Sequence, residues 1–205
     1  MTAAALDLSR IAPGFADPVR DSQAVFREVM ESVARPGRVA QLGFAAAAPH
    51  GLSRAAGAVA LTLFDFETPV WLDPALRGTE AESWLRFHCG CPLTGEAGQA
   101  DFAIVTDMAA APALSAFNQG DAKYPDRSTT VILQVEALEG GPTVTLSGPG
   151  IRTTTDIAPA GLPADFWAQL ETNQAQFQFG VDVMLVAGDR LIALPRTTSA
   201  QTKGD

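Results

Sequence analysis

The chain has 205 residues and a formal net charge of −9, a length that suits one large domain. A chain of this size can bury roughly 70% of the surface that its unfolded form exposes, so it needs no disulfide or metal ion to fold. The negative charge excludes a protein that binds nucleic acid or an anionic membrane through a basic surface.

We expect neither a membrane-spanning segment nor a secretory signal. No apolar run reaches the roughly 20 residues that span a bilayer, and 1–7 lacks a basic segment followed by an apolar core. Cys89 and Cys91 stand one residue apart, too close for an ordinary disulfide. We therefore expect a cytoplasmic protein with reduced thiols.

The first helix is predicted to begin at Asp17-Pro18, because an acidic capping residue before proline is typical of a helix start. The break at Arg35-Pro36-Gly37 ends it. Apolar residues recur between these points at helical spacing. They are Val25, Phe26, Val29, Met30 and Val33.

The remaining elements alternate along the chain. A proline at the first residue of 69–72 indicates that this strand begins there or lies at an edge. Residues 118–128 are expected to form an exposed loop. Strands are predicted over 39–42, 69–72, 102–105, 129–135, 143–146, 151–157, 181–187 and 190–194, and helices over 52–64, 79–87, 109–117 and from 162 onward.

Two hairpins are predicted late in the chain. Glu139-Gly140-Gly141-Pro142 would join 129–135 to 143–146, and Gly188-Asp189 would join the last two strands. This mixture predicts the α/β class, with a mixed sheet and flanking helices rather than a purely parallel sheet. We expect a flexible N-terminal arm over 1–16, a single α/β domain over 17–198 and a flexible tail over 199–205.

Reactive residue types are densest between Arg86 and Pro92. His88 could act as a general acid or base with Asp182 as its partner, or it could be a structural hydrogen-bonding residue. A zinc site normally needs four ligands from two separated pairs, which this sequence lacks. We therefore expect no metal site, and we expect Cys89 and Cys91 to fill the core.

Two further segments have both a binding and a structural interpretation. Gly148 and Gly150 could let backbone N–H groups bind an anion, or they could form a plain turn between strands. Arg196 and Thr197 follow the last predicted strand and could bind phosphate or carboxylate. Alternatively, Arg196 forms a salt bridge to an acidic residue of the surface.

No complete catalytic group is apparent. The sequence has no Gly-x-Ser-x-Gly motif, and its two lysines, Lys123 and Lys203, lie in a polar loop and in the tail. A buried lysine able to form a Schiff base is therefore not expected, nor is a cofactor.

Seven blocks in a fixed order resemble the H subunit of the bacterial carbon–phosphorus lyase machinery. They run from about residue 15 to 198, with the helix ending in Arg35-Pro36-Gly37 consistent with the same family. The blocks are Leu61-Thr62-Leu63-Phe64-Asp65, Thr68-Pro69-Val70-Trp71-Leu72, Leu85-Arg86-Phe87-His88, Ile132-Leu133-Gln134-Val135, Leu146-Ser147-Gly148-Pro149-Gly150-Ile151, Phe179-Gly180-Val181-Asp182 and Leu194-Pro195-Arg196-Thr197-Thr198.

The resemblance implies a cytosolic homodimer that joins the G, I and J subunits in a core complex. That complex transfers the ribose triphosphate of ATP to an alkylphosphonate and releases adenine, before the carbon–phosphorus bond is cleaved. The implied fold is similar to a reduced pyridoxal-phosphate transferase without the cofactor.

Two functions remain open at this point. The leading hypothesis is an accessory subunit of this transferase, without catalytic residues of its own. The alternative is a subunit that itself binds the phosphonate or ATP and contributes Arg and His groups to the transferase site. Its pocket would be lined by Arg35, Arg86, His88, Arg196 and Thr197, and a stand-alone hydrolase or metal enzyme is a third, remote possibility.

Overall fold

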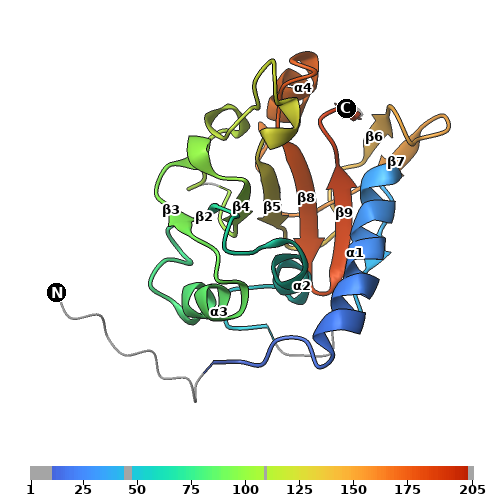
Figure 1. Ribbon diagram of the computed structural model, residues 1–205. Helices are drawn as coiled ribbons and strands as arrows, with labels where there is room; N and C mark the ends of the chain where they lie inside the picture. The colour runs from blue at the N-terminus through green and yellow to red at the C-terminus, as the bar shows by residue number, and fades with distance from the viewer. Residues whose placement is uncertain (1–10, 44–47, 109, 203–205) are drawn as a thin grey trace.

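A mixed sheet of seven strands organises the chain (Figure 1). The structure is a computed structural model that describes residues 11–43, 48–108 and 110–202. The sheet has the order β1-β9-β8-β5-β4-β2-β3. Its strands are β1 (Ala40–Gln41), β2 (Val70–Leu72), β3 (Leu93–Thr94), β4 (Phe102–Val105), β5 (Thr130–Gln134), β8 (Asp182–Ala187) and β9 (Arg190–Leu194).

The centre of this sheet is parallel and its β1 edge is antiparallel. Strands β3, β2, β4, β5 and β8 run in one direction, whereas β9 and β1 run against their neighbours. The predicted α/β class with a mixed sheet is therefore confirmed. The predicted hairpin around Gly188-Asp189 is confirmed as well, because β8 and β9 pair antiparallel across it.

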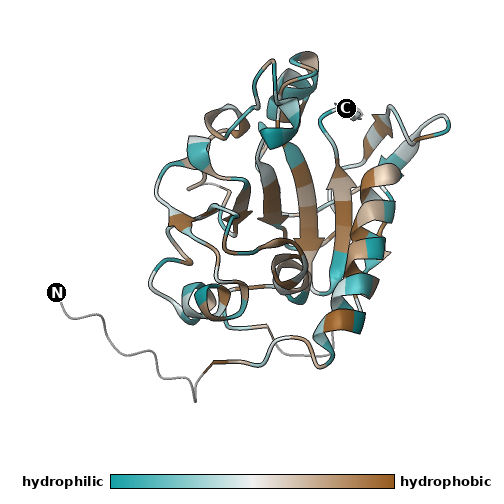
Figure 2. Cartoon of the chain, in the orientation of Figure 1, coloured by the Kyte–Doolittle hydropathy of each residue, from teal (hydrophilic) through white to brown (hydrophobic). Residues whose placement is uncertain are grey.

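Alternate side chains of the strands supply two separate cores. Ile132 and Met184 point to the face covered by α1 (Pro18–Ala34), α2 (Arg54–Leu63) and α3 (Glu80–Cys89). Val131 and Leu185 point to the opposite face, which is covered by α4 (Phe166–Ala175) and a second, smaller sheet. Because both faces are covered, the central strands are nearly continuous in apolar residues, as Figure 2 shows.

Helix ends follow the local signals of the sequence. Asp17 caps α1, and its Oδ1 accepts a hydrogen bond from the Arg20 backbone N–H at 3.1 Å. Thr79 caps α3 in the same way, and Gly90 ends α3 in the left-handed conformation with φ 66°. The predicted helices over 17–35, 52–64 and 79–87 are therefore confirmed.

The predicted hairpin between 129–135 and 143–146 is wrong. Strand β6 (Val144–Ser147) instead pairs with β7 (Thr155–Ile157) and β10 (Ser199–Thr202) in the second sheet. The chain changes layers at Gly141, where a Cβ atom would lie 2.1 Å from the Pro159 carbonyl oxygen. Gly141, which with Gly140 indicated a tight turn, thus allows a close backbone approach between layers.

The predicted helix over 109–117 is also wrong for its described part. Residue 109 lies outside the described residues, and the rest contains a single 3₁₀ turn, η3 (Leu114–Ala116). Leu114 donates its backbone N–H to Gln169 Oε1 at 2.9 Å, so α4 takes a donor that a helix would use internally. The loop over 118–128 contains a second 3₁₀ turn, η4 (Pro125–Arg127).

Both chain ends pack more closely than the sequence predicted. Residues 1–10 and 203–205 lie outside the described residues, but Ile11, Ala12 and Phe15 of the predicted arm pack against the first core. Residues 199–202 of the predicted tail form β10, whose Ala200 is buried. The tail prediction failed because polar Ser, Gln and Thr residues also suit a half-exposed edge strand.

Within the described residues, no helix is both long and apolar enough to cross a membrane.

Candidate functional site

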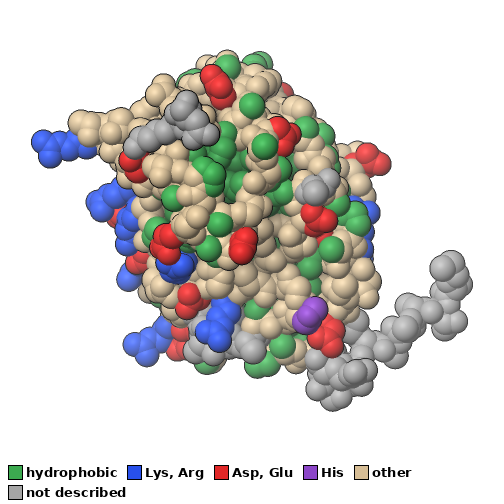
Figure 3. Space-filling view, turned by 180° about the vertical axis from the view of Figure 1, so that it is seen from behind, with side chains coloured by type: hydrophobic (Ala, Val, Ile, Leu, Met, Phe, Trp, Pro, Cys, Tyr) green, Lys and Arg blue, Asp and Glu red, His purple; other side chains and the backbone are tan. Residues whose placement is uncertain are grey.

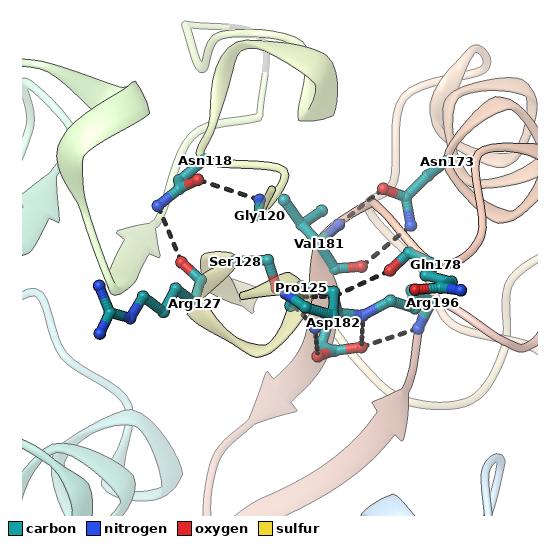
Figure 4. A network of polar contacts seen from close by, with 10 residues as sticks. All are labelled: Asn118, Gly120, Pro125, Arg127, Ser128, Asn173, Gln178, Val181, Asp182 and Arg196. Carbon is teal, nitrogen blue, oxygen red and sulfur yellow. Dashed lines mark hydrogen bonds and ion pairs between the residues drawn. The ribbon is translucent and has the colours of Figure 1, made fainter. Parts of the chain in front are cut away.

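Arg196 occupies the amino end of the parallel strands, beside the first residue of β8. Its guanidinium forms a two-pronged pair with Asp182, with Nη2 at 2.6 Å from Oδ2 and Nε at 3.2 Å from Oδ1 (Figure 4). The Arg196 backbone N–H also donates to Asp182 Oδ1 at 2.8 Å. This pair fixes the chain after β9 to the start of β8.

The remaining donors of Arg196 bind two neighbouring loops. Nη1 donates to the carbonyl oxygens of Pro125 at 2.7 Å and Gln178 at 3.4 Å, and Nη2 donates to Ser128 Oγ. The side chain is 13% exposed. All three guanidinium nitrogens therefore have protein partners, which supports the salt-bridge interpretation of Arg196 over the ligand-binding one.

Two amide side chains, Asn173 and Asn118, also bind the backbone of the loops around Arg196. Asn173 accepts the Val181 N–H at 2.8 Å and donates to the Val181 carbonyl at 2.9 Å. Asn118 accepts from the Gly120 N–H at 3.0 Å and donates to the Arg127 carbonyl at 2.8 Å. Figure 4 shows these bonds flanking the Arg196–Asp182 pair, so the network is a structural joint between loops.

Gly148 and Thr197 meet near this joint through their backbones. Gly148 has φ 135°, and a Cβ atom there would lie 2.8 Å from the Thr197 carbonyl oxygen. The position therefore requires glycine for close packing between the β6–β7 loop and the segment before β10. Thr198 Oγ1, also in that segment, is buried without a hydrogen-bond partner among the described residues.

His88 lies on α3, away from the Arg196–Asp182 pair. Its Nε2 is 2.9 Å from the Ala12 carbonyl oxygen, and its ring packs 4.9 Å from those of Trp84 and Phe87. Asp182 pairs with Arg196 instead, so the His88–Asp182 pair that a general acid or base role would use does not form. This geometry favours the structural interpretation of His88.

Cys89 is the last residue of α3 and Cys91 follows the Gly90 cap, and both face the first core, where Cys91 is buried. The hydrogen bond between their thiols, with burial, raises the pKa of Cys89 above its ordinary value. The same bond, aided by the charge of Arg86, lowers the pKa of Cys91. No group of three or more His, Cys, Asp or Glu residues could hold a metal ion in the part of the chain that is described.

Arg86 lies on the outer side of α3, far in sequence from the other candidate arginines. Its Nε is 3.0 Å from Glu82 Oε1, one turn earlier. The Gly78 N–H and then the Arg86 guanidinium lower the pKa of Glu82 against the opposing effect of burial. Arg86 and Arg77 line a hollow of about 190 Å³ beside Leu93 and Thr94.

Arg35 and Gly150 are brought together at the end of α1. They line a second hollow of about 240 Å³, together with Arg38, Arg152 and three consecutive threonines, 153–155. Sequence reasoning missed Arg38 and Arg152. The run Arg152-Thr153-Thr154-Thr155 was a visible signal of anion-binding residue types, but its contact with the end of α1 depends on tertiary packing.

Asp73 is a second residue that the sequence reasoning missed. It directly follows β2, is buried, and accepts hydrogen bonds from the backbone N–H groups of Leu76, Thr106 and Asp107 and from Thr106 Oγ1. Strands β2 and β4 meet where the strand order reverses, a common place for ligands at the carboxyl ends of such sheets. Here Asp73 instead binds the two loops to each other.

The eight candidate residues therefore lie in three places rather than in one pocket. Arg196, Asp182, Thr197 and Gly148 lie at or beside the structural joint, Arg86 and His88 lie on α3, and Arg35 and Gly150 line the hollow at the end of α1.

Comparison with known sequences assigns the family. The model of the family described as bacterial phosphonate metabolism protein (PhnH) matches residues 13–201. The chain belongs to this family. The match covers all four helices named above and ends within β10, so both the joint and the hollow lie inside the region typical of PhnH proteins.

Two curated proteins are similar to this chain over most of their length. The chain is 47% identical over 190 residues to the alpha-D-ribose 1-methylphosphonate 5-triphosphate synthase subunit PhnH of Rhizobium meliloti (strain 1021), covering 91% of this chain and 94% of that protein. It is 29% identical over 185 residues to the putative C-P lyase subunit protein HtxG of Stutzerimonas stutzeri, covering 89% and 87%.

Proposed function

We propose that this chain is an accessory subunit of a carbon–phosphorus lyase complex. It would be needed for transfer of ribose triphosphate from ATP to an alkylphosphonate, without supplying the catalytic groups. The observation that carries the proposal is the 47% identity to a synthase subunit across 94% of that relative. The two proteins therefore correspond over most of their length.

The arrangement of the candidate residues supports an accessory role. Arg196 and Asp182 bind each other, and His88 binds the Ala12 carbonyl. A catalytic site needs its groups to converge within hydrogen-bond reach of one substrate. These groups are separated and already engaged within the chain.

We also propose that the chain forms a homodimer and contacts the G, I and J subunits. Support comes from α1, where Val19 is 80% exposed, Phe26 47% and Met30 49%. The three residues recur at helical spacing and lie on one outer face of the helix. Phenylalanine and methionine are enriched at the centres of protein interfaces, and Arg20 and Arg27 stand beside them.

Two finer features belong to the same proposal. The fold would be a reduced version of a pyridoxal-phosphate transferase without the cofactor, which the parallel centre of the sheet supports. Lys123 is exposed in a loop with its ammonium 4.9 Å from the Tyr124 ring, a setting unlike that of a buried Schiff-base lysine. The protein would act in the cytoplasm, where the thiols of Cys89 and Cys91 stay reduced.

Co-purification tests the accessory role. The tagged chain is expressed with the G, I and J subunits, and the captured proteins are identified by mass spectrometry. Size-exclusion chromatography then measures the size of the assembly. We expect a stable assembly, and loss of the other subunits from Phe26→Asp together with Met30→Asp. The matched control is Phe66→Asp, because Phe66 is 74% exposed but lies outside α1. A chain that captures none of these subunits contradicts the accessory role.

The alternative function, direct binding of phosphonate or ATP, keeps support from one observation. Arg35 and Gly150 line the same hollow, which also contains two arginines that the sequence did not single out. Arg86, His88, Arg196 and Thr197 do not line it. If this chain binds a phosphate-bearing ligand, the end of α1 is where the geometry favours it.

A further inference from the structure

The hollow at the end of α1 combines residue types that suit an oxyanion. Three guanidinium groups and three hydroxyl groups line it, and none of the described carboxylates does. They come from two distant segments, the α1–β1 turn and the β6–β7 loop. The six side chains are Arg35, Arg38, Arg152, Thr153, Thr154 and Thr155.

The arginines keep most of their donors available. Arg35 Nη1 is 3.2 Å from Glu31 Oε2, and Arg38 Nη2 is 3.1 Å from Glu28 Oε2. Each of these exposed ion pairs uses one nitrogen of a group that has five N–H donors, and exposed pairs are weak. Arg152 has no hydrogen bond or ion pair with any described residue.

Two glycines hold the walls of the hollow in contact. Gly150 has φ 84°, and a Cβ atom there would lie 2.2 Å from the Ala34 carbonyl oxygen at the last residue of α1. Gly37 has φ 85°, and its Cβ would lie 2.6 Å from Thr155 Cγ2. The β6–β7 loop is therefore packed on the α1 end by its backbone, which places the arginines of both segments together before any ligand binds.

Local charge decides what this surface attracts. The whole chain carries −9, yet Lys and Arg side chains gather along the left side of Figure 3, the side of α1 and the β6–β7 loop. Exposed charges are screened over roughly 8 Å at physiological salt, so nearby charges set the field in the hollow: the carboxylates of Glu31 and Glu28, each paired with an arginine, and the three arginines, which outnumber them. The arginines must also outweigh the partial negative charge at the C-terminal end of α1, which disfavours an anion.

We propose that this hollow binds a phosphate-type oxyanion, either the phosphate chain of a nucleoside triphosphate or the headgroup of an alkylphosphonate. Arginine forks donate two parallel hydrogen bonds to such groups, and threonine hydroxyls add single donors. The hollow has room for the anionic group but not for the rest of a nucleotide, which would remain outside it. The proposal does not depend on the accessory role.

Calorimetric titration of the full chain at low salt tests the site. The probes are sodium tripolyphosphate, inorganic phosphate and methylphosphonate. We expect binding of at least one probe that weakens as sodium chloride is added. Tighter binding of tripolyphosphate would assign the site to a triphosphate chain, and tighter binding of methylphosphonate would assign it to the phosphonate. Absence of heat with all three probes overturns the proposal.

Matched variants separate the hollow from general surface charge. Arg152→Ala and Arg35→Ala should each weaken binding at least tenfold, and Arg152→Lys should weaken it less than Arg152→Ala, because charge remains without the fork. Arg20→Ala removes another exposed arginine, at the start of α1 and outside the hollow, and should leave affinity within twofold. An equal loss in Arg20→Ala and Arg152→Ala overturns the site. The co-purification above is scored separately, so either result stands alone.

Discussion

Two arginine-rich regions of this protein look alike in sequence and differ in structure. Arg196 is 13% exposed, and all its guanidinium nitrogens bind protein atoms at the amino end of the sheet. Arg35 has a side chain that is 66% exposed and has one ion pair, and Arg152 has none among the described residues. The first region joins elements of the fold, whereas the second leaves donors available for another molecule.

The difference shows which property separates a structural arginine from a binding one. Residue type and a nearby threonine are the same in both places, since Thr197 follows Arg196 and Thr153 follows Arg152. What differs is whether carboxylates and carbonyls of the chain already accept the hydrogen bonds. Substitutions in the first region should therefore affect stability, and those in the second should affect binding.

The largest effect is expected for Arg196→Met. It would remove the guanidinium partner of Asp182, of Ser128 and of the Pro125 carbonyl at once, and each group left unsatisfied at such a partly buried position costs about 1–3 kcal/mol. Urea unfolding measures this loss. The control is Arg190→Met, because Arg190 pairs with Glu139, whose side chain is 65% exposed, and should lose under about 1 kcal/mol. Similar losses in both variants would remove the distinction between the regions.

The packing that builds the hollow can be tested next, with Gly150→Ala. The added Cβ would meet the Ala34 carbonyl oxygen at 2.2 Å, and overpacking of this kind costs about 1–3 kcal/mol in addition to the strain of a positive φ. Gly140→Ala is the matched control, because Gly140 has φ 91° but no atom within 4 Å of its Cβ. The difference between their unfolding free energies isolates the contact, and a difference near zero would argue against it.

Arg86 offers an intermediate case through its partner Glu82. The Gly78 N–H and the Arg86 guanidinium lower the pKa of Glu82 below its ordinary value of 4.5. A carboxyl group whose pKa is lower in the folded state stabilises the fold at every pH above its unfolded-state pKa. This stabilisation is lost as the pH falls through the folded-state pKa. Glu82→Gln should therefore have a lower melting temperature than the parent at pH 7, corresponding to under about 1 kcal/mol of unfolding free energy. The difference between the two melting temperatures should shrink below pH 4.5. An equal difference in melting temperature at pH 3 and pH 7 would show that the ionisation of Glu82 does not stabilise the fold.

The smallest effect on stability is expected for Arg152→Ala. No described residue loses a hydrogen bond or an ion pair, so the free energy of unfolding should stay within about 0.5 kcal/mol of the parent. Urea unfolding under the same conditions as for Arg196→Met gives the direct comparison. A loss above about 1 kcal/mol would mean that Arg152 also serves the fold.

Local signals made part of this fold predictable. The capping residue Asp17, the break at Pro36-Gly37 and the turn at Gly188-Asp189 stand directly beside the elements that they delimit, so a local sequence pattern is enough to predict them. The predicted hairpin at Glu139–Pro142 failed for the opposite reason. Gly141 instead serves a contact with Pro159, 18 residues later in the chain, which no local pattern indicates.

The candidate residues could be predicted by type but not by role. The two interpretations of Arg196 depended on where Asp182 lies, and only the pairing of β8 with β9 places it within 2.6 Å. The hollow needed a contact between Ala34 and Gly150, more than 100 residues apart in the chain. Asp73 was visible only as an acidic residue after a strand, and its bonds to Thr106 depend on the pairing of β2 with β4.

Strand β10 has a practical consequence for anyone who prepares this protein. Its four residues, Ser199–Thr202, cover one edge of β6, and Ala200 is buried in the second core. A shortened version ending at residue 198 would leave a row of unpaired backbone donors and acceptors on β6, a surface that readily joins strands of other molecules. Affinity tags on this end therefore need a spacer, and trimming should stop after Thr202.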